Sequence, residues 1–218
     1  MRKLIVVFSI FMVACSALKS TDTLLKEVWN DDQQPRQQML KLTKAVTVDG
    51  CTELIDSLIL VNEIVERNDA RNIKVVDKIL KRGLPQGLSE ESYKTIWIVI
   101  DHAPLEKQEQ YLPLVEQMAN ASYIGLDEYA ILYDRIAMEQ NRPQRYGSQI
   151  VQFGNADNLQ LYVWPIEDAE KLDSLRNAVG MSSFYNYLKH IEETMGIPTV
   201  YNTHLTIEEL NKMRGIEK

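Results

Sequence analysis

The sequence predicts a mainly α protein, a single helical domain that carries one small antiparallel β-hairpin. Apolar residues recur at intervals of three and four along most of the chain, which is the spacing of one face of an α-helix. Polar and apolar residues alternate, as they do in a strand, in two neighbouring stretches near residues 147–164. The chain has 218 residues, of which 45% are hydrophobic, so it can bury one sizeable core.

The N-terminus resembles a bacterial export signal. Two basic residues precede an almost entirely apolar run at 4–13, and a small residue and Cys15 follow it. The run is too short to cross a membrane as a stable helix, which takes roughly 20 residues. We therefore expect residues 1–14 to be a signal peptide and Cys15, in a lipobox-like position, to be the site of lipid attachment. Residues 15–23 would form a polar tether, and residues 24–218 the helical domain.

These features predict a lipoprotein that is anchored in a membrane and faces the periplasm. Signal cleavage without lipidation, giving a soluble periplasmic or secreted protein, is the alternative. The chain carries 24 basic and 31 acidic residues, a formal net charge of −7 at pH 7. That balance argues against a nucleic acid partner, which needs a basic patch, and against electrostatic docking on anionic lipid. We expect contact with the membrane through the lipid anchor alone, and the sequence leaves the oligomeric state open.

Motifs that hold metals or cofactors are missing from the sequence. It contains no His-Glu-x-x-His, no Cys-x-x-Cys and no glycine-rich phosphate loop. Three histidines and one cysteine besides Cys15 would leave a metal site mostly to carboxylates. We therefore expect no metal and no cofactor. Lipidation of Cys15 leaves Cys51 without a disulfide partner, and free cysteine is more often a small buried apolar group than a reactive thiol.

The first half of the domain is predicted to consist of short helices. The pattern begins at Leu24, and Pro35 is expected to start a new segment because proline suits a first turn. A further apolar face runs through residues 54–65. Residues 68–69, Asn and Asp, predict a break before the next helix at 73–80.

Capping residues identify the helices of the middle and C-terminal parts. Ser89 has the features of an N-cap, so the apolar run 95–100, which fits a buried strand equally well, is assigned to a helix. Helices from Pro104 and after Gly125 follow. The two alternating stretches then form the hairpin, at 148–153 and 159–163 with a five-residue loop between them.

Three helices are expected after the hairpin. The first begins after Asp168 and ends at Gly180, and the second runs over residues 183–196. The last is a short helix that starts at residues 206–209, which have the spacing of a capping box.

His102 is the first candidate for chemistry, because it directly follows the buried run. It could act as a general base or acid in a cleft, with Asp134 or Glu167 as the carboxylate that orients it. It could equally cap the helix or bond a buried carbonyl group.

Asp134 and Arg135 lie in a helix that is apolar on most of its surface, so each charge there needs a partner. Arg135 could clamp a carboxylate of a ligand, or it could form an internal ion pair with Glu167 or Asp168.

The open end of the hairpin should bring a further polar cluster together. Tyr146 and Gln149 enter the hairpin, and Glu167 and Asp168 leave it. Such a cluster could bind a small polar ligand, or it could tie a marginal two-stranded hairpin to the helices.

The same residues lie in spaced blocks that resemble a bacterial domain-of-unknown-function family, number 6624, over roughly residues 25–190. The blocks are Trp97-x-Val99-Ile100-x-His102-Ala103, Gln108-x-x-Tyr111-Leu112-Pro113, Asp134-Arg135, Pro143-Gln144-x-Tyr146-Gly147-x-Gln149, and Pro165-Ile166-Glu167-Asp168 through Arg176 and Val179-Gly180, with Asp32-Gln33 and Arg36 upstream. Asp101 stands where the family often has glutamine. The resemblance implies no activity. We count Asp101 and Gln108, which lie in these blocks, among the candidate ligand-binding residues.

The sequence therefore assigns no activity, and three functions stay open. The first is binding of a small polar or anionic ligand, anchored by Arg135 and oriented by Tyr146, Gln149 and His102. The second is a hydrolase or lyase that uses His102 as general base. The third is a purely structural envelope protein in which these polar groups satisfy one another. An Arg135 with an unpaired edge in a pocket would favour the first, and a His102 ring nitrogen open to solvent the second.

Overall fold

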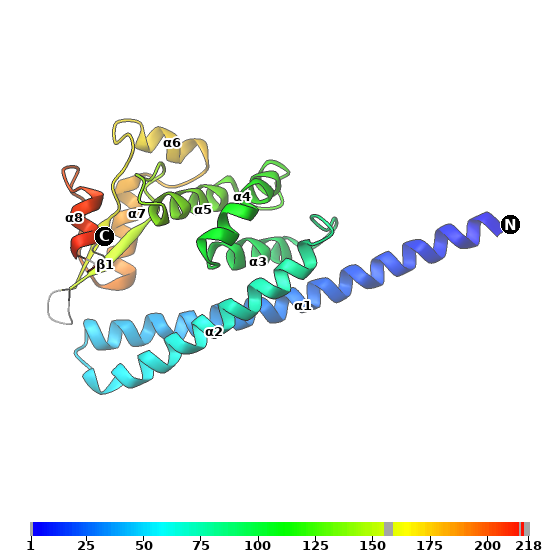
Figure 1. Cartoon of the computed structure of the whole chain (residues 1–218), viewed down its shortest axis with the longest axis horizontal. Helices are drawn as coiled ribbons and strands as arrows, with labels where there is room; N and C mark the ends of the chain where they lie inside the picture. The colour runs from blue at the N-terminus through cyan, green and yellow to red at the C-terminus, as the bar shows by residue number, and fades with distance from the viewer. Residues whose placement is uncertain (1, 155–158, 214, 216–218) are drawn as a thin grey trace.

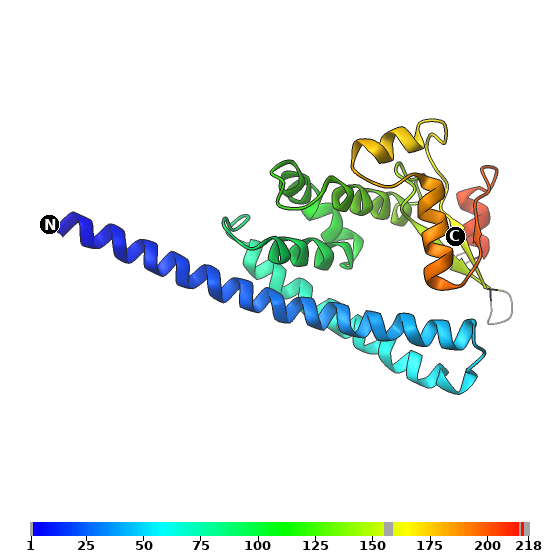
Figure 2. The same ribbon diagram turned by 180° about the vertical axis from the view of Figure 1, so that it is seen from behind.

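A computed structural model of the chain describes residues 2–154, 159–213 and 215, with side chains from residue 21 onward. Four of the five residues of the expected hairpin loop and the side chain of Cys15, the predicted site of lipid attachment, lie outside these limits. The fold is mainly α, as the sequence predicts (Figures 1 and 2). The elements are α1 Arg2–Thr47, a 3-10 turn η1 Thr52–Leu54, α2 Ile55–Leu80, α3 Glu90–Asp101, α4 Leu105–Asn120, α5 Leu126–Glu139, β1 Ile150–Phe153, β2 Gln160–Val163, α6 Leu172–Ala178, α7 Phe184–Met195, β3 Thr199–Val200 and α8 Ile207–Met213.

The first two helices form a long antiparallel pair, and α1 extends well past the end of α2 (Figure 1). The new segment expected at Pro35 is wrong, because α1 continues through this residue. Proline in a helix removes one backbone hydrogen bond. Contacts with neighbouring helices on both sides of Pro35, from Asp32 to α3 and from Arg36 to α2, hold α1 in place.

Residues 15–23, expected to form a tether, are helical and belong to α1. The last part of this stretch packs onto α3, since Asp22 accepts hydrogen bonds from the side chains of Ser89 and Ser92. Leu25, one turn later, is completely buried. The stretch contains no glycine or proline that would end a helix. The contacts of Asp22 and the burial of Leu25 therefore stabilise a helix that continues through residues 15–23.

The predicted break at Asn68 and Asp69 is also wrong, because α2 runs unbroken from Ile55 to Leu80. Both side chains instead make contacts between α1 and α2. Asn68 donates to the backbone carbonyl of Asp31 at 2.7 Å, and Asp69 pairs with Arg36. Polar residues that look like a helix end in the sequence are here interhelical contacts.

The helices predicted from caps are confirmed. The Ser89 hydroxyl accepts a hydrogen bond from the Ser92 amide at 3.2 Å and so caps α3. The run that follows is buried on nearly every side, and Ile96 and Ile100 are completely inaccessible. A helix in the centre of the core needs this all-round apolar character, which is why periodicity could not distinguish it from a strand.

The predicted hairpin is confirmed, but it is part of a three-stranded mixed sheet. β1 and β2 pair antiparallel with Ile150 opposite Val163, and β3 adds to β2 in parallel. The third strand has two residues, Thr199 and Val200, which are too few to show an alternating pattern. The helices α7 and α8 lie beside this sheet (Figure 2), where Leu210 of α8 packs with Val151 and Phe184 of α7 with Val163. Among the described residues, no helix combines the length and apolar character needed to span a bilayer.

Candidate functional site

A pocket of about 620 Å³ opens between α5 and α7, with the sheet as its floor. Helix α5 contributes Arg135, the carboxylate Asp127 and two apolar side chains. Helix α7 contributes Tyr187 and two further apolar side chains. Ser148 and Gln149 line it just before β1, and Arg176 reaches it from α6. The pocket therefore gathers residues from three of the sequence blocks described above, among them two arginines.

Arg176 is buried, with 2% of its surface exposed, yet it forms no ion pair with a described carboxylate. Its Nε donates to the carbonyl of Ser182 and its Nη1 to that of Tyr146, both at 2.7 Å. The aromatic ring of Tyr187 lies under the guanidinium, 4.8 Å from Cζ to the ring centroid. Burial lowers the pKa of Arg176 from its ordinary value, which expresses the cost of holding this charge away from water.

Arg135 is half-buried and carries the second positive charge. Its Nε donates to Oδ1 of Asp101 at 2.9 Å, and its terminal nitrogens bond to no described residue. The internal partners expected from the sequence, Glu167 and Asp168, are not used. The Glu167 side chain is exposed, and Asp168 pairs with Lys171 at 2.8 Å. Hence the arginine meets a carboxylate 34 residues away rather than one at the hairpin.

Asp134 holds the loop that leads into β1. It is completely buried and accepts hydrogen bonds from the amides of Arg145, Tyr146 and Ser148 at 2.7 to 3.1 Å, and from the Ser148 hydroxyl. Burial raises the pKa of this carboxyl, and the hydrogen bonds oppose the rise. The hydrogen bonds of this carboxylate go to the loop rather than to His102.

Gln144 and Gln149 close the open end of the hairpin. Gln144, fully buried, accepts from the Gln149 amide at 2.7 Å and donates to the carbonyls of Gln149 and Trp164. The sequence places Gln144 just upstream of the expected cluster, but nothing in the sequence marks it as its centre. Of the four residues expected to meet here, Gln149 does so, whereas the Tyr146 side chain packs against the ring of Tyr133 and does not line the pocket. The Glu167 backbone joins through its amide, which donates to the Gln144 carbonyl, while its side chain and that of Asp168 face outward.

His102 lies outside this pocket, at the C-terminal end of α3. Its Nδ1 is 2.9 Å from Oδ1 of Asp32 on α1, and its Nε2 is 4.0 Å from Oδ2 of Asp101. The carboxylate that orients it is therefore Asp32, and not Asp134 or Glu167 as the sequence suggested. Both ring nitrogens face carboxylates, so neither has the open, solvent-facing position that a general base requires.

A network of alternating charges surrounds His102. Asp32 is buried, which works to raise its pKa, but the hydrogen bond and charge of His102, with Arg36, outweigh burial and leave this pKa lowered. Arg36 also pairs with Asp69. Asp32, Asp69 and His102 offer ligand atoms within 4.8 Å of one another, as a metal site would. Because Arg36 already bonds both carboxylates, the cluster is neutralised from within the protein.

Gln108 has a structural position. It is buried and donates to the carbonyls of Asp101 and Ala103, which end α3, and to the side chain of Glu139. The last carbonyls of a helix lack partners within the helix, and Gln108 supplies one. It does not line the pocket.

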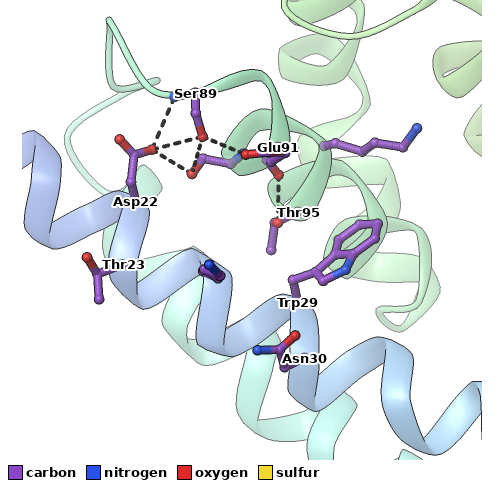
Figure 3. A pocket seen from close by; sticks show the side chains of 10 residues that line it. Asp22, Thr23, Trp29, Asn30, Ser89, Glu91 and Thr95 are labelled. Carbon is purple, nitrogen blue, oxygen red and sulfur yellow. Dashed lines mark hydrogen bonds between the residues drawn. The ribbon is translucent and has the colours of Figure 1, made fainter.

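A second hollow, of about 670 Å³, is a groove between α1 and α3 (Figure 3). Figure 3 shows Asp22 facing Ser89 across it, and Asp22 also accepts from Ser92 at 2.6 Å. The charges along the groove are mixed, since acidic Glu91 and basic Lys26 both line it. The groove therefore has no concentrated charge of either sign, and the arginine pocket is the stronger candidate for a binding site.

A family model described as a family of unknown function, DUF6624, matches residues 22–200. No curated protein and no solved structure matches the chain. The match spans both arginines of the pocket as well as the His102 network, and it carries no activity with it.

Proposed function

We propose that this chain, which belongs to the DUF6624 family of unknown function, binds a small anionic ligand in the pocket between α5 and α7. The observation that carries the proposal is Arg176, a buried guanidinium in the wall of a pocket with no ion pair to a described carboxylate.

The energetic argument concerns the cost of this charge. Removing an ion from water costs several kcal/mol, and an opposite charge usually offsets that cost. The carbonyl groups of Tyr146, Gly147 and Ser182 accept hydrogen bonds from the Arg176 guanidinium. These bonds also hold the loop before β1 in place. The carboxylates of Asp173 and Asp134 act on this charge from beyond ion-pair distance, so an anionic ligand would supply the direct partner that it lacks among the described residues.

Arg135 strengthens the proposal because it offers the same chemistry on the opposite wall. Its bond to Asp101 uses Nε and leaves the terminal nitrogens for a ligand. Ser148 and Gln149 also line the pocket, but their donors are used within the protein, by Asp134 and by the carbonyl of Ile131. The two guanidinium groups therefore carry the recognition, and guanidinium suits carboxylate or phosphate oxygens.

The test is a thermal-shift series with sodium phosphate, sulfate and acetate, each compared with chloride at equal ionic strength. A ligand present at 100 times its dissociation constant stabilises the folded state by about 2.7 kcal/mol, so a bound anion raises the melting temperature. Arg176→Gln should abolish the shift and Arg135→Gln should reduce it, whereas the matched surface variant Arg71→Gln should retain it. Equal shifts in all four proteins, or no shift with any anion, would overturn the proposal.

We also propose export and lipid anchoring, supported by the basic start, the apolar run at 4–13 and Cys15. Asp22, which bonds Ser89 and Ser92 of the α3 N-terminus, follows the expected cleavage point, so cleavage after Ala14 leaves this contact intact. Mass spectrometry of the N-terminus from the natural host should find a diacylated cysteine at Cys15. An unmodified N-terminus at Met1 would contradict the proposal.

A further inference from the structure

We infer that the ligand of this pocket is an anionic amphiphile: a carboxylate or phosphate head group on an unbranched apolar chain. This rests on the proposed function and adds the class of ligand. The inference comes from the α7 wall of the pocket, which is polar beside Arg176 and apolar toward Met195.

The polar end is fixed by contacts among its members. The hydroxyl of Tyr187 donates to the carbonyl of Ser148 at 2.8 Å, and the same ring lies against Arg176. Gln149 is adjacent, with its amide nitrogen 3.1 Å from the Ser148 hydroxyl. Both the start of α7 and the segment that leads into β1 therefore meet the guanidinium at one place.

The wall formed by α7 becomes apolar away from that end. Its pocket-lining residues are Tyr187, Ile191 and Met195, spaced every fourth position and so on one face of the helix. At roughly 1.5 Å per residue, Met195 lies about 12 Å along the helix axis from Tyr187. Ile191 and Met195 are half-buried, which leaves apolar surface for a ligand.

The floor runs in the same direction. Residues 148–152 follow the sheet for about 13 Å at roughly 3.3 Å per residue, and Leu161 lies opposite Gln152 in the β1–β2 register. The amide of Leu161 donates to the carbonyl of Pro198, just beyond the end of α7. The far end of the floor and the far end of α7 therefore coincide, so the pocket is a trough that begins at Arg176 and runs along α7.

Methionines line much of the rest of the trough, which favours an alkyl chain over a rigid ring. Met138 and Met181 join Met195, together with Ile131 and Ile150, and Asp127 and Gln152 are polar members of the same lining. Methionine side chains are flexible and polarizable, so they adapt to chains of different length. A volume of about 620 Å³ is within the usual range for a small-molecule site.

The test is isothermal titration of the full chain with acetate, hexanoate, octanoate and decanoate below their aggregation limits. Burial of one methylene group strengthens binding about fourfold, so affinity should rise by that factor per methylene until the trough is filled. 1-Decanol, which lacks the charge, should bind far more weakly than decanoate. Decanoate should bind with a stoichiometry of one per chain. A head-group requirement and a chain-length requirement are thus measured separately.

Variants distinguish this inference from the proposed function. Ile191→Gln and Met195→Gln should reduce decanoate affinity toward that of acetate and leave the phosphate shift unchanged. The matched control is Ile59→Gln, an apolar residue on α2 that is 53% exposed and outside the pocket. Two substitutions at the trough guard against one that impairs folding, and each is accepted only if its circular dichroism spectrum matches the wild type.

Each outcome assigns a result to one of the two proposals. If all four carboxylates bind with equal affinity, and acetate and phosphate bind through Arg176, the inference of an amphiphilic ligand is overturned and the proposal of an anion site stands. No binding of any anion overturns the proposed function itself. 1-Decanol bound as tightly as decanoate shows an apolar trough without anion recognition, which overturns both.

Discussion

Replacing Asp134 tests whether one buried carboxylate organises the loop at the pocket. The substitution Asp134→Ala leaves three buried backbone amides, those of Arg145, Tyr146 and Ser148, without their acceptor. A buried group left unpaired costs about 1–3 kcal/mol, and removal of a buried charge from its network costs about 3–5 kcal/mol in measured cases. We take about 3–5 kcal/mol for the whole change, because the loop can relax toward water.

The assay is urea denaturation followed by circular dichroism. The slope of the unfolding free energy against urea concentration is compared between variant and wild type. For a chain of this size each kcal/mol lowers the melting temperature by about 2–4 °C, so the fall should be about 6–20 °C. Asp134→Asn keeps one acceptor oxygen and should lie between Asp134→Ala and the wild type. Asp49→Ala, which removes an exposed carboxylate, should leave the midpoint unchanged. A loss below about 1 kcal/mol for Asp134→Ala would refute the assignment of this residue as the anchor of the loop.

Three further predictions concern Asp32 in the network around His102, and Gly147 and Gln144 in the segment that leads into β1. His102 and Arg36 hold the pKa of Asp32 below its ordinary value, so Asp32 stabilises the fold at neutral pH and this contribution is lost as pH falls below about 4. Asp32→Asn should therefore cost about 2 kcal/mol at pH 7. Urea titrations at several pH values should show the stability difference between variant and wild type disappearing in acid. Gly147→Ala should cost at least about 1–2 kcal/mol by thermal melting, because φ is +65° and the new Cβ would lie 3.0 Å from the Phe184 ring; an unchanged melting temperature would contradict the strain. Gln144→Ala removes three buried hydrogen bonds and should cost about 2–4 kcal/mol, with amide exchange of the Gln149 N–H accelerating because it loses its acceptor.

The sequence predicted those parts of the fold that local chemistry determines. Ser89 caps its helix as expected, and the helix expected from residue 183 begins at Ser183, which is its cap. Thr206 and Glu209 form the reciprocal hydrogen bonds of the expected capping box. Each of these signals depends on residues within one turn of one another. The alternating strands of the hairpin are local in the same sense.

The errors all lie where distant contacts outweigh local preference. Pro35 and the pair Asn68–Asp69 carry the local signs of helix ends, yet both lie inside helices that pack against one another. The reason is that Arg36 reaches Asp69 and Asn68 reaches the backbone of Asp31, and neither contact can be read from spacing along one segment.

The candidate site shows the same division between residues and their partners. The sequence identified Arg135, Asp134 and His102 as charges in apolar surroundings, which is a local property. It could not supply their partners: Asp101 lies 34 residues from Arg135, and Asp32 lies 70 residues from His102. Arg176 stood in the sequence only as part of a motif block, because its burial depends on how α6 and α7 close over the loop before β1.

The two arginines of the pocket are consequently not equivalent. Arg135 is the last member of a chain of alternating charges that continues through Asp101 and His102 to Asp32, so its charge is matched within the protein. Arg176 lies outside that chain, and its described hydrogen bonds go to carbonyl groups. An incoming anion therefore gains most at Arg176, whose charge Asp173 and Asp134 oppose only from beyond ion-pair distance, and it competes with Asp101 at Arg135. The structural reading, in which every polar group is satisfied internally, holds for Asp134 and Gln144 but leaves Arg176 unexplained.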